Sequence, residues 1–239
     1  MRSLTAKHAL TTGTQTRRLT GHPGRVTAVA VAELEGRPHA ITGSQDGFMR
    51  GWDLTTSSEP LILFGHSEGI TAVVMAEIEG LLHVVTGSDN GAVRVWGLST
   101  GIETHRRTGH TSWVTAVAVA VAELEGRPHA ITGSNDRSEG VWDLTTGIEF
   151  RIEFRTRLGH VEGVSAVAVA ELEGRPHAIT GSDDGSVRGW DLTTGSCRTN
   201  FHLPDAALAA AIAPDGTVVL GVGHEVVALS LKPLAGRLH

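Results

Sequence analysis

The chain has 239 residues, of which 40% are hydrophobic and 19% are charged, a composition typical of a globular protein and not of a disordered one. Its formal net charge of −6 argues against a broadly basic surface that would bind nucleic acid or acidic membranes. Cys197 is the single cysteine, so we expect no intramolecular disulfide and no cysteine-rich zinc site, and we expect a reducing, cytoplasmic location. Residues 1–15 lack the apolar core of a signal peptide, and no apolar run approaches the roughly 18 residues of a membrane span.

The sequence is a tandem repeat. The segments 26–57 and 164–195 differ at only five positions, and two further copies begin at Ile70 and Val114. Each copy follows a Gly-His pair, and the second and third of these histidines each lie 44 residues after the one before, whereas the fourth follows after 50. These histidines are His22, His66, His110 and His160.

The six extra residues indicate that the repeats are strands. One insertion is a dipeptide in the Ala-Val run that ends at Ala122, and the other is a duplicated tetrapeptide within 148–155. Both have even length, and an even insertion in a strand keeps every later side chain on its original face. Runs rich in Val, Ala and Thr alternate with turns of Gly, Pro, Asp and Asn, which predicts four antiparallel strands per unit. The Ala-Val runs are apolar on both faces, so we expect sheets packed between two neighbours.

The spacing from Gly-His through Thr-Gly-Ser and a turn Asp to Trp-Asp resembles the WD-repeat β-propeller family over residues 14 to about 195. The resemblance implies an all-β propeller of four-stranded antiparallel blades. It also implies a structural hydrogen-bond network of His, Thr, Asp and Trp within each blade. Asn90 replaces the turn Asp and Gly97 replaces the Asp of Trp-Asp, so the second network should be weaker. The matching residues are His22, Thr42, Asp46 and Trp52; His66, Thr86, Asn90 and Trp96; His110, Thr132, Asp136 and Trp142; and His160, Thr180, Asp184 and Trp190.

The two ends of the chain are less regular. Residues 207–231 predict three strands, with turns at Asp215-Gly216 and Gly223-His224. Residues 14–20 match the fourth strand of a unit, and in the resembling family a terminal strand often completes the last blade. We therefore expect residues 14–20 to close the last blade, with an open fragment of a larger ring, or a ring completed by another chain, as the alternatives. The chain is then one domain, 1–239, of five blades: about 21–64, 65–108, 109–158, 159–203, and a degenerate 204–231 completed by 14–20.

We expect no metal, no cofactor and no catalysis. Eight of the thirteen histidines recur at fixed repeat positions (the four Gly-His residues with His39, His83, His129 and His177), which favours structural roles. The other five, His8, His105, His202, His224 and His239, show no ligand spacing. The chain has no phosphate-binding loop, nucleophile elbow or HExxH motif, and a catalytic site would need one asymmetric constellation in a largely symmetric chain.

Binding information should lie where the repeats differ, on the loops that carry the Gly-His and Asp turns. Trp113 is the only tryptophan outside the structural series and is of a type often dominant in interfaces, although it could instead fold over its own blade. Formal charges favour a basic protein or peptide partner. The acids are Glu68, Glu162, Asp46, Asp89, Asp136, Asp183 and Asp184, some of them expected to be internally bonded, against Arg25 and Arg137. The candidate partner-binding residues are Arg25, Gln45, Asp89, Trp113, Asn135 and Asp183.

Three alternatives remain open. An arginine-rich outer rim could bind nucleic acid or anionic lipid, although outer-strand charges also protect strand edges. A central channel with an asymmetric polar cluster would favour a small-ligand or hydrolytic propeller. The segment 60–64, Pro-Leu-Ile-Leu-Phe, could form a modest apolar contact patch. The rim arginines are Arg17, Arg18, Arg106, Arg107, Arg151, Arg155, Arg157 and Arg198.

Overall fold

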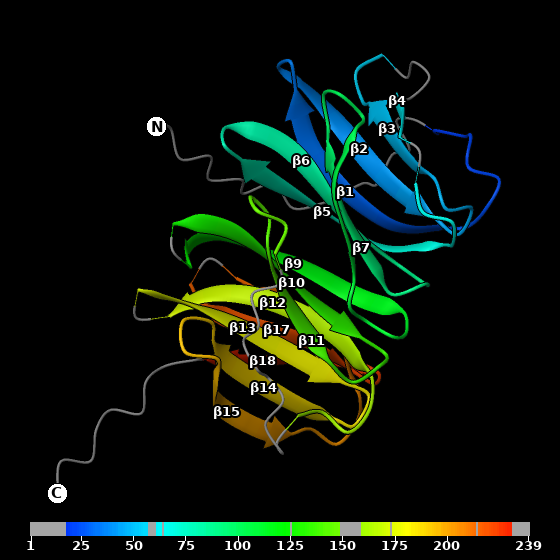
Figure 1. Cartoon of the computed structure of the whole chain (residues 1–239). Coiled ribbons are helices and arrows are strands. Elements are labelled where there is room, and N and C mark those ends of the chain that lie inside the picture. Colours follow the sequence, from blue (N-terminus) through cyan, green and yellow to red (C-terminus); the bar gives the residue numbers. More distant parts are fainter. Residues whose placement is uncertain are drawn as a thin grey trace, which may run out of the picture.

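The computed structural model describes residues 18–56, 61–63, 65–124, 126–148, 159–172, 174–213 and 215–230. The described residues contain β-strands and no helix. The strands form five antiparallel sheets, which we name A to E in chain order (Figure 1). The expected all-β class is therefore correct. The described residues contain no helix long and apolar enough to cross a membrane.

Each sheet is a simple meander in which consecutive strands pair. Sheet A consists of β1 (Val26–Leu34), β2 (Arg37–Ser44), β3 (Met49–Asp53) and β4 (Leu61–Leu63). Sheet B consists of β5 (Ile70–Ile78), β6 (Leu81–Ser88), β7 (Ala92–Gly97) and β8 (Glu103–Thr108). Sheet C consists of β9 (Val114–Leu124), β10 (Arg127–Ser134) and β11 (Glu139–Asp143). Sheet D consists of β12 (Val164–Leu172), β13 (Arg175–Ser182), β14 (Ser186–Asp191) and β15 (Ser196–His202), and sheet E of β16 (Ala207–Ile212), β17 (Thr217–Val222) and β18 (Glu225–Ser230).

Tight hairpins join the first two strands of sheets A and B. Glu35 and Gly36, between β1 and β2, have φ angles of 50° and 73°. Two consecutive residues with positive φ fit a two-residue hairpin turn whose twist matches that of the flanking strands. Glu79 and Gly80 repeat this geometry between β5 and β6, with φ angles of 51° and 77°.

The core of the protein lies between successive sheets. The first strand of each sheet packs against the first strand of the next, in the order β1, β5, β9, β12 and β16. At the boundary of sheets A and B, the buried residues Ile41 and Met49 of one sheet meet Ile70 and Trp96 of the other. Figure 1 shows the blue sheet A, the teal sheet B and the green sheet C in this order, with the orange-to-red sheet E overlapping the yellow sheet D in this view.

The three strands expected in residues 207–231 are present as β16, β17 and β18. The closing strand stays a prediction: residues 14–17 lie outside the described residues, and residues 18–20 form no strand. Most of the segment 148–155, expected as the fourth strand of sheet C, also lies outside them. Of the expected patch at 60–64, the structure describes only the backbone of β4.

Strand β1 departs from the expectation that both faces of each first strand are covered. Val29 and Val31 are 63% and 66% exposed. By contrast Val167, which has the place of Val29 in β12, is 9% exposed. The difference arises because sheet C packs against β12, whereas no sheet precedes sheet A in the described part of the chain.

Candidate functional site

A threonine hydroxyl is the centre of a hydrogen-bond network in sheet A. His22 Nε2 lies 2.8 Å from Thr42 Oγ1, and Trp52 Nε1 donates to the same oxygen at 2.8 Å. His22 Nδ1 lies 2.9 Å from Asp46 Oδ2, so the network ties the Gly-His loop to the turn after β2. Because Trp52 is buried and its N–H is bonded, the network anchors the loops to the sheet core.

Sheets C and D carry the same network. His110 Nε2 and Trp142 Nε1 lie 2.8 and 2.9 Å from Thr132 Oγ1. In sheet D, His160 Nε2 lies 2.8 Å from Thr180 Oγ1, and Trp190 Nε1 donates to that oxygen at 2.9 Å. The turn aspartates differ in their distance from the histidine: His110 Nδ1 to Asp136 Oδ2 is 3.3 Å, whereas His160 Nδ1 to Asp184 Oδ1 is 3.7 Å.

The turn aspartates of these networks are ionised and internally engaged. Burial raises the pKa of Asp46, but hydrogen bonds from His22 and from the Phe48 backbone outweigh it, so the net pKa is lowered. The pKa values of Asp136 and Asp184 are lowered in the same way, against burial, chiefly by hydrogen bonds from His110 and Ser186 respectively. These three acids therefore do not belong in a count of free charge on the loops.

The network of sheet B lacks one link. His66 Nε2 lies 2.7 Å from Thr86 Oγ1, but His66 Nδ1 is buried without a hydrogen-bond partner. Asn90, in place of the turn aspartate, donates to Ser67 Oγ at 3.1 Å instead. Burial, assisted by the nearby cation of Arg94, lowers the pKa of His66 to about 3, so this imidazole is neutral at physiological pH.

The candidate partner-binding residues form one row along the loop ends of the sheets. We call it the loop row and define it as Arg25, Gln45, Gly69, Asp89, Trp113, Asn135, Gly163 and Asp183. Within each sheet two of its residues are joined by a backbone hydrogen bond of 2.9 to 3.0 Å. The pairs are Gln45 with Arg25, Asp89 with Gly69, Asn135 with Trp113, and Asp183 with Gly163.

Two glycines connect the row across sheet boundaries. A Cβ atom on Gly69 would lie 2.6 Å from Asp89 Oδ2 and 3.3 Å from Gln45 Cα. A Cβ on Gly163 would lie 2.8 Å from Asn135 Oδ1 and 3.0 Å from Asp183 Oδ2. The backbone of Gln45 in sheet A therefore approaches Gly69 of sheet B, and the side chain of Asn135 in sheet C approaches Gly163 of sheet D.

Trp113 is the exposed aromatic side chain of the row, at 53% exposure. The other four tryptophans are at most 5% exposed. Two carboxylates of the row interact with neighbouring groups: burial and the nearby Glu68 raise the pKa of Asp89, and Asp183 accepts a hydrogen bond from Ser165. Without the network aspartates, these loops contain four acids and two bases. The acids are Glu68, Asp89, Glu162 and Asp183, and the bases are Arg25 and Arg137.

At the opposite end of the strands, sheet B departs from the repeat in two coupled positions. In sheets A and C an arginine at the start of the second strand pairs with the Asp of Trp-Asp: Arg37 with Asp53 at 3.1 Å, and Arg127 with Asp143 at 2.7 Å. The corresponding pair in sheet D, Arg175 with Asp191, is at 3.7 Å. The same register positions in sheet B are Leu81 and Gly97, so both partners of the ion pair are replaced together.

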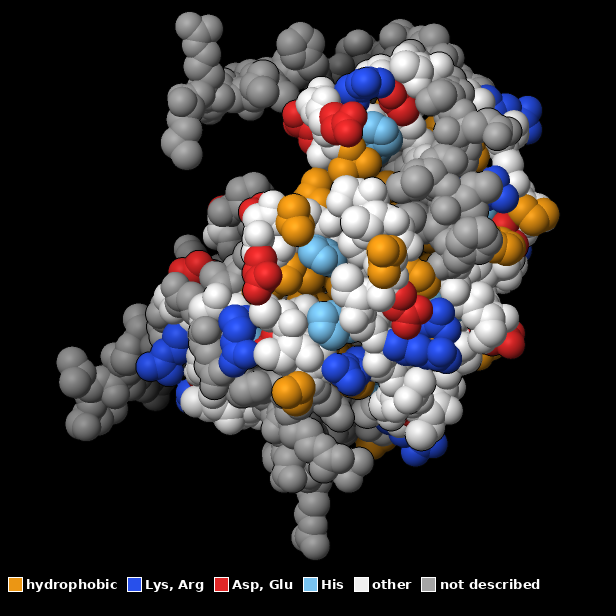
Figure 2. All heavy atoms as spheres, turned by 45° about the horizontal axis from the view of Figure 1, so that its top comes forward, with side chains coloured by type: hydrophobic (Ala, Val, Ile, Leu, Met, Phe, Trp, Pro, Cys, Tyr) orange, Lys and Arg blue, Asp and Glu red, His pale blue; other side chains and the backbone are white. Residues whose placement is uncertain are grey.

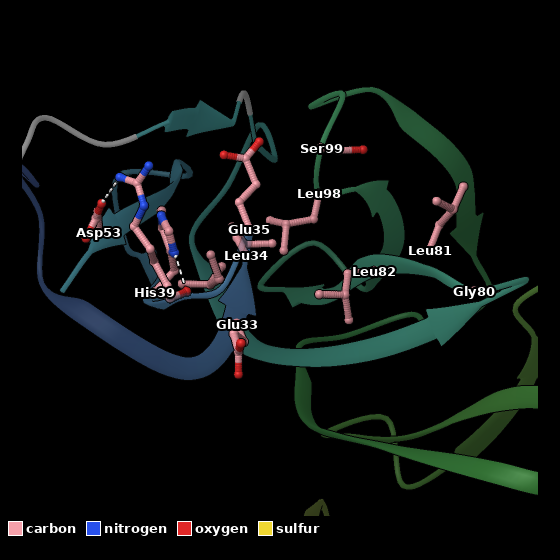
Figure 3. A pocket seen from close by; sticks show the side chains of 13 residues that line it. Glu33, Leu34, Glu35, His39, Asp53, Gly80, Leu81, Leu82, Leu98 and Ser99 are labelled. Carbon is pink, nitrogen blue, oxygen red and sulfur yellow. Dashed lines mark hydrogen bonds and ion pairs between the residues drawn. The ribbon is translucent and has the colours of Figure 1, made fainter. Parts of the chain in front are cut away.

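An open pocket of about 520 Å³ lies beside this replacement, between sheets A and B, and we call it the A–B pocket (Figure 3). Leu34, Leu82 and Leu98 contribute apolar side chains from the two sheets. Glu35 and Ser99 also line the pocket, and Leu81 is 62% exposed. Sequence reasoning noticed Gly97 but missed its coupling to Leu81, although aligning the repeats displays both changes.

The recurring histidines outside the networks hold the hairpins. His39 Nδ1 lies 3.0 Å from Arg37 O, and His83, His129 and His177 make the equivalent contact at 2.9 to 3.0 Å. Among the described residues, no group of three or more His, Cys, Asp or Glu is placed to hold a metal ion. His8 and His239 lie outside the described residues.

The rim arginines that the structure describes do not form a shared site. Arg106 and Arg107 lie on β8, and Arg198 on β15 donates to Asp191 Oδ2 at 2.9 Å. On the face shown in Figure 2, acidic and basic side chains are interspersed around hydrophobic and histidine side chains. Arg18 is exposed and lies outside any strand, and Arg17, Arg151, Arg155 and Arg157 lie outside the described residues.

Five meandering antiparallel sheets are stacked through their first strands, and sheets A to D each contain a His–Thr–Trp network. This arrangement defines a repeat protein built of propeller-type blades. A family model described as WD domain, G-beta repeat matches residues 13–53, 58–97 and 153–191, about half of the chain. The chain therefore belongs to the WD-repeat family, whose members are typically non-enzymatic scaffolds for protein–protein interaction. A comparison with curated proteins finds no match.

Proposed function

We propose that this chain is a non-catalytic scaffold whose loop row binds a basic segment of a partner protein. The observation that carries the proposal is the half-exposed Trp113, on loops where the four acids outside the networks (Glu68, Asp89, Glu162 and Asp183) outnumber the two bases Arg25 and Arg137. A large aromatic side chain at an interface supplies contact area at low conformational cost, and aromatic anchors dominate binding energy in many interfaces. The partner would present lysine or arginine side chains to Asp89 and Asp183.

The hydrogen-bond networks support a scaffold role. In sheets A, C and D the repeated histidine, threonine and tryptophan side chains are engaged with one another, and they hold the loops against the sheets. A rigid loop row loses little conformational entropy when a partner binds. We extend the proposal to five blades, with residues 14–20 as the fourth strand of the last blade. The three-stranded sheet E, with β18 at its edge, supports this blade count. We also propose a cytoplasmic location.

Partner capture with matched variants tests the loop row. Trp113→Ala removes the aromatic anchor, and Asp183→Lys reverses one exposed charge. Glu171→Lys reverses an exposed charge on β12, at the far end of that strand from the loop row, and serves as the control. A partner recovered by the wild type and by Glu171→Lys should be depleted with the other two variants. Equal recovery with all four proteins would rule out the loop row as the binding surface.

The A–B pocket is a second candidate contact of the same scaffold, for an apolar side chain of the partner. The coupled replacement of an arginine and an aspartate by Leu81 and Gly97 supports it, because it removes the ion pair from sheet B alone of sheets A to D. The sheet A side of the pocket keeps Arg37 and Asp53. The double variant Leu81→Arg, Gly97→Asp would rebuild the ion pair of the other sheets. We expect it to lose the part of partner binding that resists high salt, since apolar contacts are not screened. Salt-resistant binding that survives in the double variant would exclude the pocket.

A further inference from the structure

In the part of the chain that the structure describes, no sheet covers the two ends of the stack. Four boundaries join the five sheets, and at each one the first strand of a sheet packs on the preceding sheet. Sheet A therefore keeps a free back face, which is the face that β5, β9, β12 and β16 each bury. Sheet E keeps a free forward face, which is the face that sheets A to D each bury. In the described residues, no comparable boundary joins β1 to the strands of sheet E.

A side chain at the start of each first strand acts as a knob at the boundary. In sheets B to E this residue is fully buried. In sheet A the same position is Val26, which is 49% exposed. The four buried knobs are Ile70, Val114, Val164 and Ala207, each 0% exposed.

Each buried knob occupies a notch left by a glycine in the second strand of the preceding sheet. A Cβ on Gly43 would lie 2.4 Å from Ile70 Cγ2, and one on Gly87 would lie 2.6 Å from Val114 Cγ1. Gly133 and Gly181 repeat this relationship, at 2.6 Å from Val164 Cγ1 and 2.8 Å from Ala207 Cβ. Glycine is needed at these positions because any side chain would displace the knob.

Sheet E has the notch without the knob. Gly221 pairs with Ala209 as Gly43 pairs with Ala28, so it occupies the notch position. The nearest atoms to a Cβ on Gly221 belong to Ala209 of the same sheet, at 3.4 Å, and none from another sheet lies within 4 Å. Sheet E lacks the histidine, aspartate and tryptophan of the repeat, yet it has a glycine at this position.

Apolar side chains surround both the free knob and the free notch. Val226 is 76% exposed on sheet E, whereas Met49 at the same register position of sheet A is 0% exposed. Val29 and Val31 extend the exposed apolar face of sheet A. Exposed apolar faces of this kind mark surfaces that pack against another chain.

We propose that the back face of sheet A packs on the forward face of sheet E of a second copy of this chain, with Val26 seated against Gly221. The occupant is a second copy because each free face is one half of a boundary that already forms four times within the chain. Within one copy the described strands of sheet A form no boundary with those of sheet E. The contact is head-to-tail: the back face of one copy meets the forward face of the next. Such a heterologous contact generates a ring or an open chain of subunits.

The solution mass of the purified full chain, measured by analytical ultracentrifugation over a range of concentrations, tests the proposal. We expect a concentration-dependent mass of at least two 25.1 kDa chains. A single-chain mass at every concentration would overturn the proposal, whether the chain closes on itself or leaves its ends for an unrelated partner.

Three variants define the contact. Val26→Asp puts a charge on the free knob, and Gly221→Val fills the free notch; each should sediment as a single chain with an unchanged circular dichroism spectrum. Ile102→Asp changes an apolar residue that is 64% exposed between β7 and β8, away from both faces, and should associate like the wild type. An oligomer that persists in Val26→Asp would overturn the proposal even if Gly221→Val failed to fold.

Mixing the two blocked variants tests the head-to-tail geometry. Gly221→Val retains a normal knob and Val26→Asp retains a normal notch, so an equimolar mixture should form a species of two chains and no larger one. A mixture that stays at the single-chain mass, or that assembles beyond two chains, would contradict the geometry.

Discussion

Glu139 Oε1 lies 3.4 Å from His160 Nε2 across the boundary between sheets C and D. Glu139 occupies the register position that Met49, Val93 and Val187 fill in the other sheets, and its side chain is 2% exposed. The Thr180 hydroxyl donates to the same oxygen at 3.3 Å. Burial raises the pKa of Glu139 to about 7, and burial lowers the pKa of His160 to about 4. A titratable group therefore stands at a position where the repeat otherwise places a hydrophobic side chain.

Stability should fall as pH rises through the pKa of Glu139. Because the folded-state pKa is raised from 4.5 to about 7, the contribution is fully present below pH 4.5 and is lost as pH rises through about 7. A shift of this size corresponds to about 3 kcal/mol in the free energy of unfolding. Glu139→Val, which copies Val93 and Val187, should therefore be more stable than the wild type above the raised pKa, as measured by urea unfolding across the pH range.

Glu139→Gln is the control for that prediction, because it keeps the shape of the side chain and cannot ionise. The other charged groups that act on this boundary, Asp136, Asp184, Arg188 and His160, are retained in both variants. The difference in pH slope between the wild type and Glu139→Gln isolates Glu139. An identical slope in both proteins would show that the pKa of Glu139 does not differ between the folded and unfolded states, and would contradict the prediction.

Asn90→Asp should stabilise sheet B. The new carboxylate can accept the hydrogen bond that His66 Nδ1 lacks, as Asp46 does from His22 Nδ1 in sheet A. We expect the free energy of unfolding to rise by about 1 kcal/mol, with a higher pKa for His66. Asp46→Asn makes the reverse change in sheet A and should lower the free energy by a similar amount. Urea unfolding measures both variants, and a neutral result for the pair would mean that this link does not stabilise the blades.

Arg137→Gly should relieve backbone strain in the turn after β10. Arg137 has a φ angle of 72°, at the position where Gly47, Gly91 and Gly185 have angles of 79°, 78° and 76°. A non-glycine residue in this region costs roughly 1 to 3 kcal/mol, partly offset by the greater freedom of glycine in the unfolded chain. We expect a net gain of about 1 kcal/mol. Gly91→Arg should lower the free energy of unfolding by more than this gain, because a Cβ there would lie 2.4 Å from the carbonyl oxygen of His110. In thermal unfolding, the midpoint temperature should therefore rise for Arg137→Gly and fall for Gly91→Arg.

Two tryptophans should respond differently to the same substitution. Trp142→Phe removes the hydrogen bond from Nε1 to Thr132 Oγ1, at 2.9 Å in a buried site, and should cost about 1 to 2 kcal/mol of stability. Trp113→Phe changes a half-exposed side chain and should alter stability by no more than about 0.5 kcal/mol. Equal losses in urea unfolding would show that Trp113 is a structural residue of sheet C.

The repeat made much of the fold predictable. Its strands follow from the runs rich in Val, Ala and Thr, from insertions of even length, and from the glycines and aspartates of the turns, and all of these are local signals. The membership of the loop row was also predictable from the repeat. Arg25 and Trp113 occupy the same repeat position, and Asp89 occupies the position whose backbone N–H bonds to it. Their alignment across sheet boundaries required the structure, because it depends on the close approach at Gly69 and Gly163.

Features that depend on contacts between sheets were missed. The sequence displays Glu139 and Leu81 as departures from the repeat, but it does not reveal that Glu139 faces His160 of the next sheet or that Leu81 lies beside a pocket. The exposure of Val29 and Val31 was unexpected for a related reason. An apolar pattern shows that a face is suited to burial, and only the arrangement of sheets shows what covers it.

Binding of a labelled peptide rich in lysine and arginine, followed by fluorescence anisotropy, tests the proposed function of the loop row most directly. The comparison includes wild type, Trp113→Ala and Asp183→Lys, and an acidic peptide of the same length. We predict saturable binding of the basic peptide by the wild type, at least about tenfold weaker binding by each variant, and no binding of the acidic peptide. Equal affinity of all three proteins for the basic peptide, or equal affinity of the wild type for both peptides, would contradict the account.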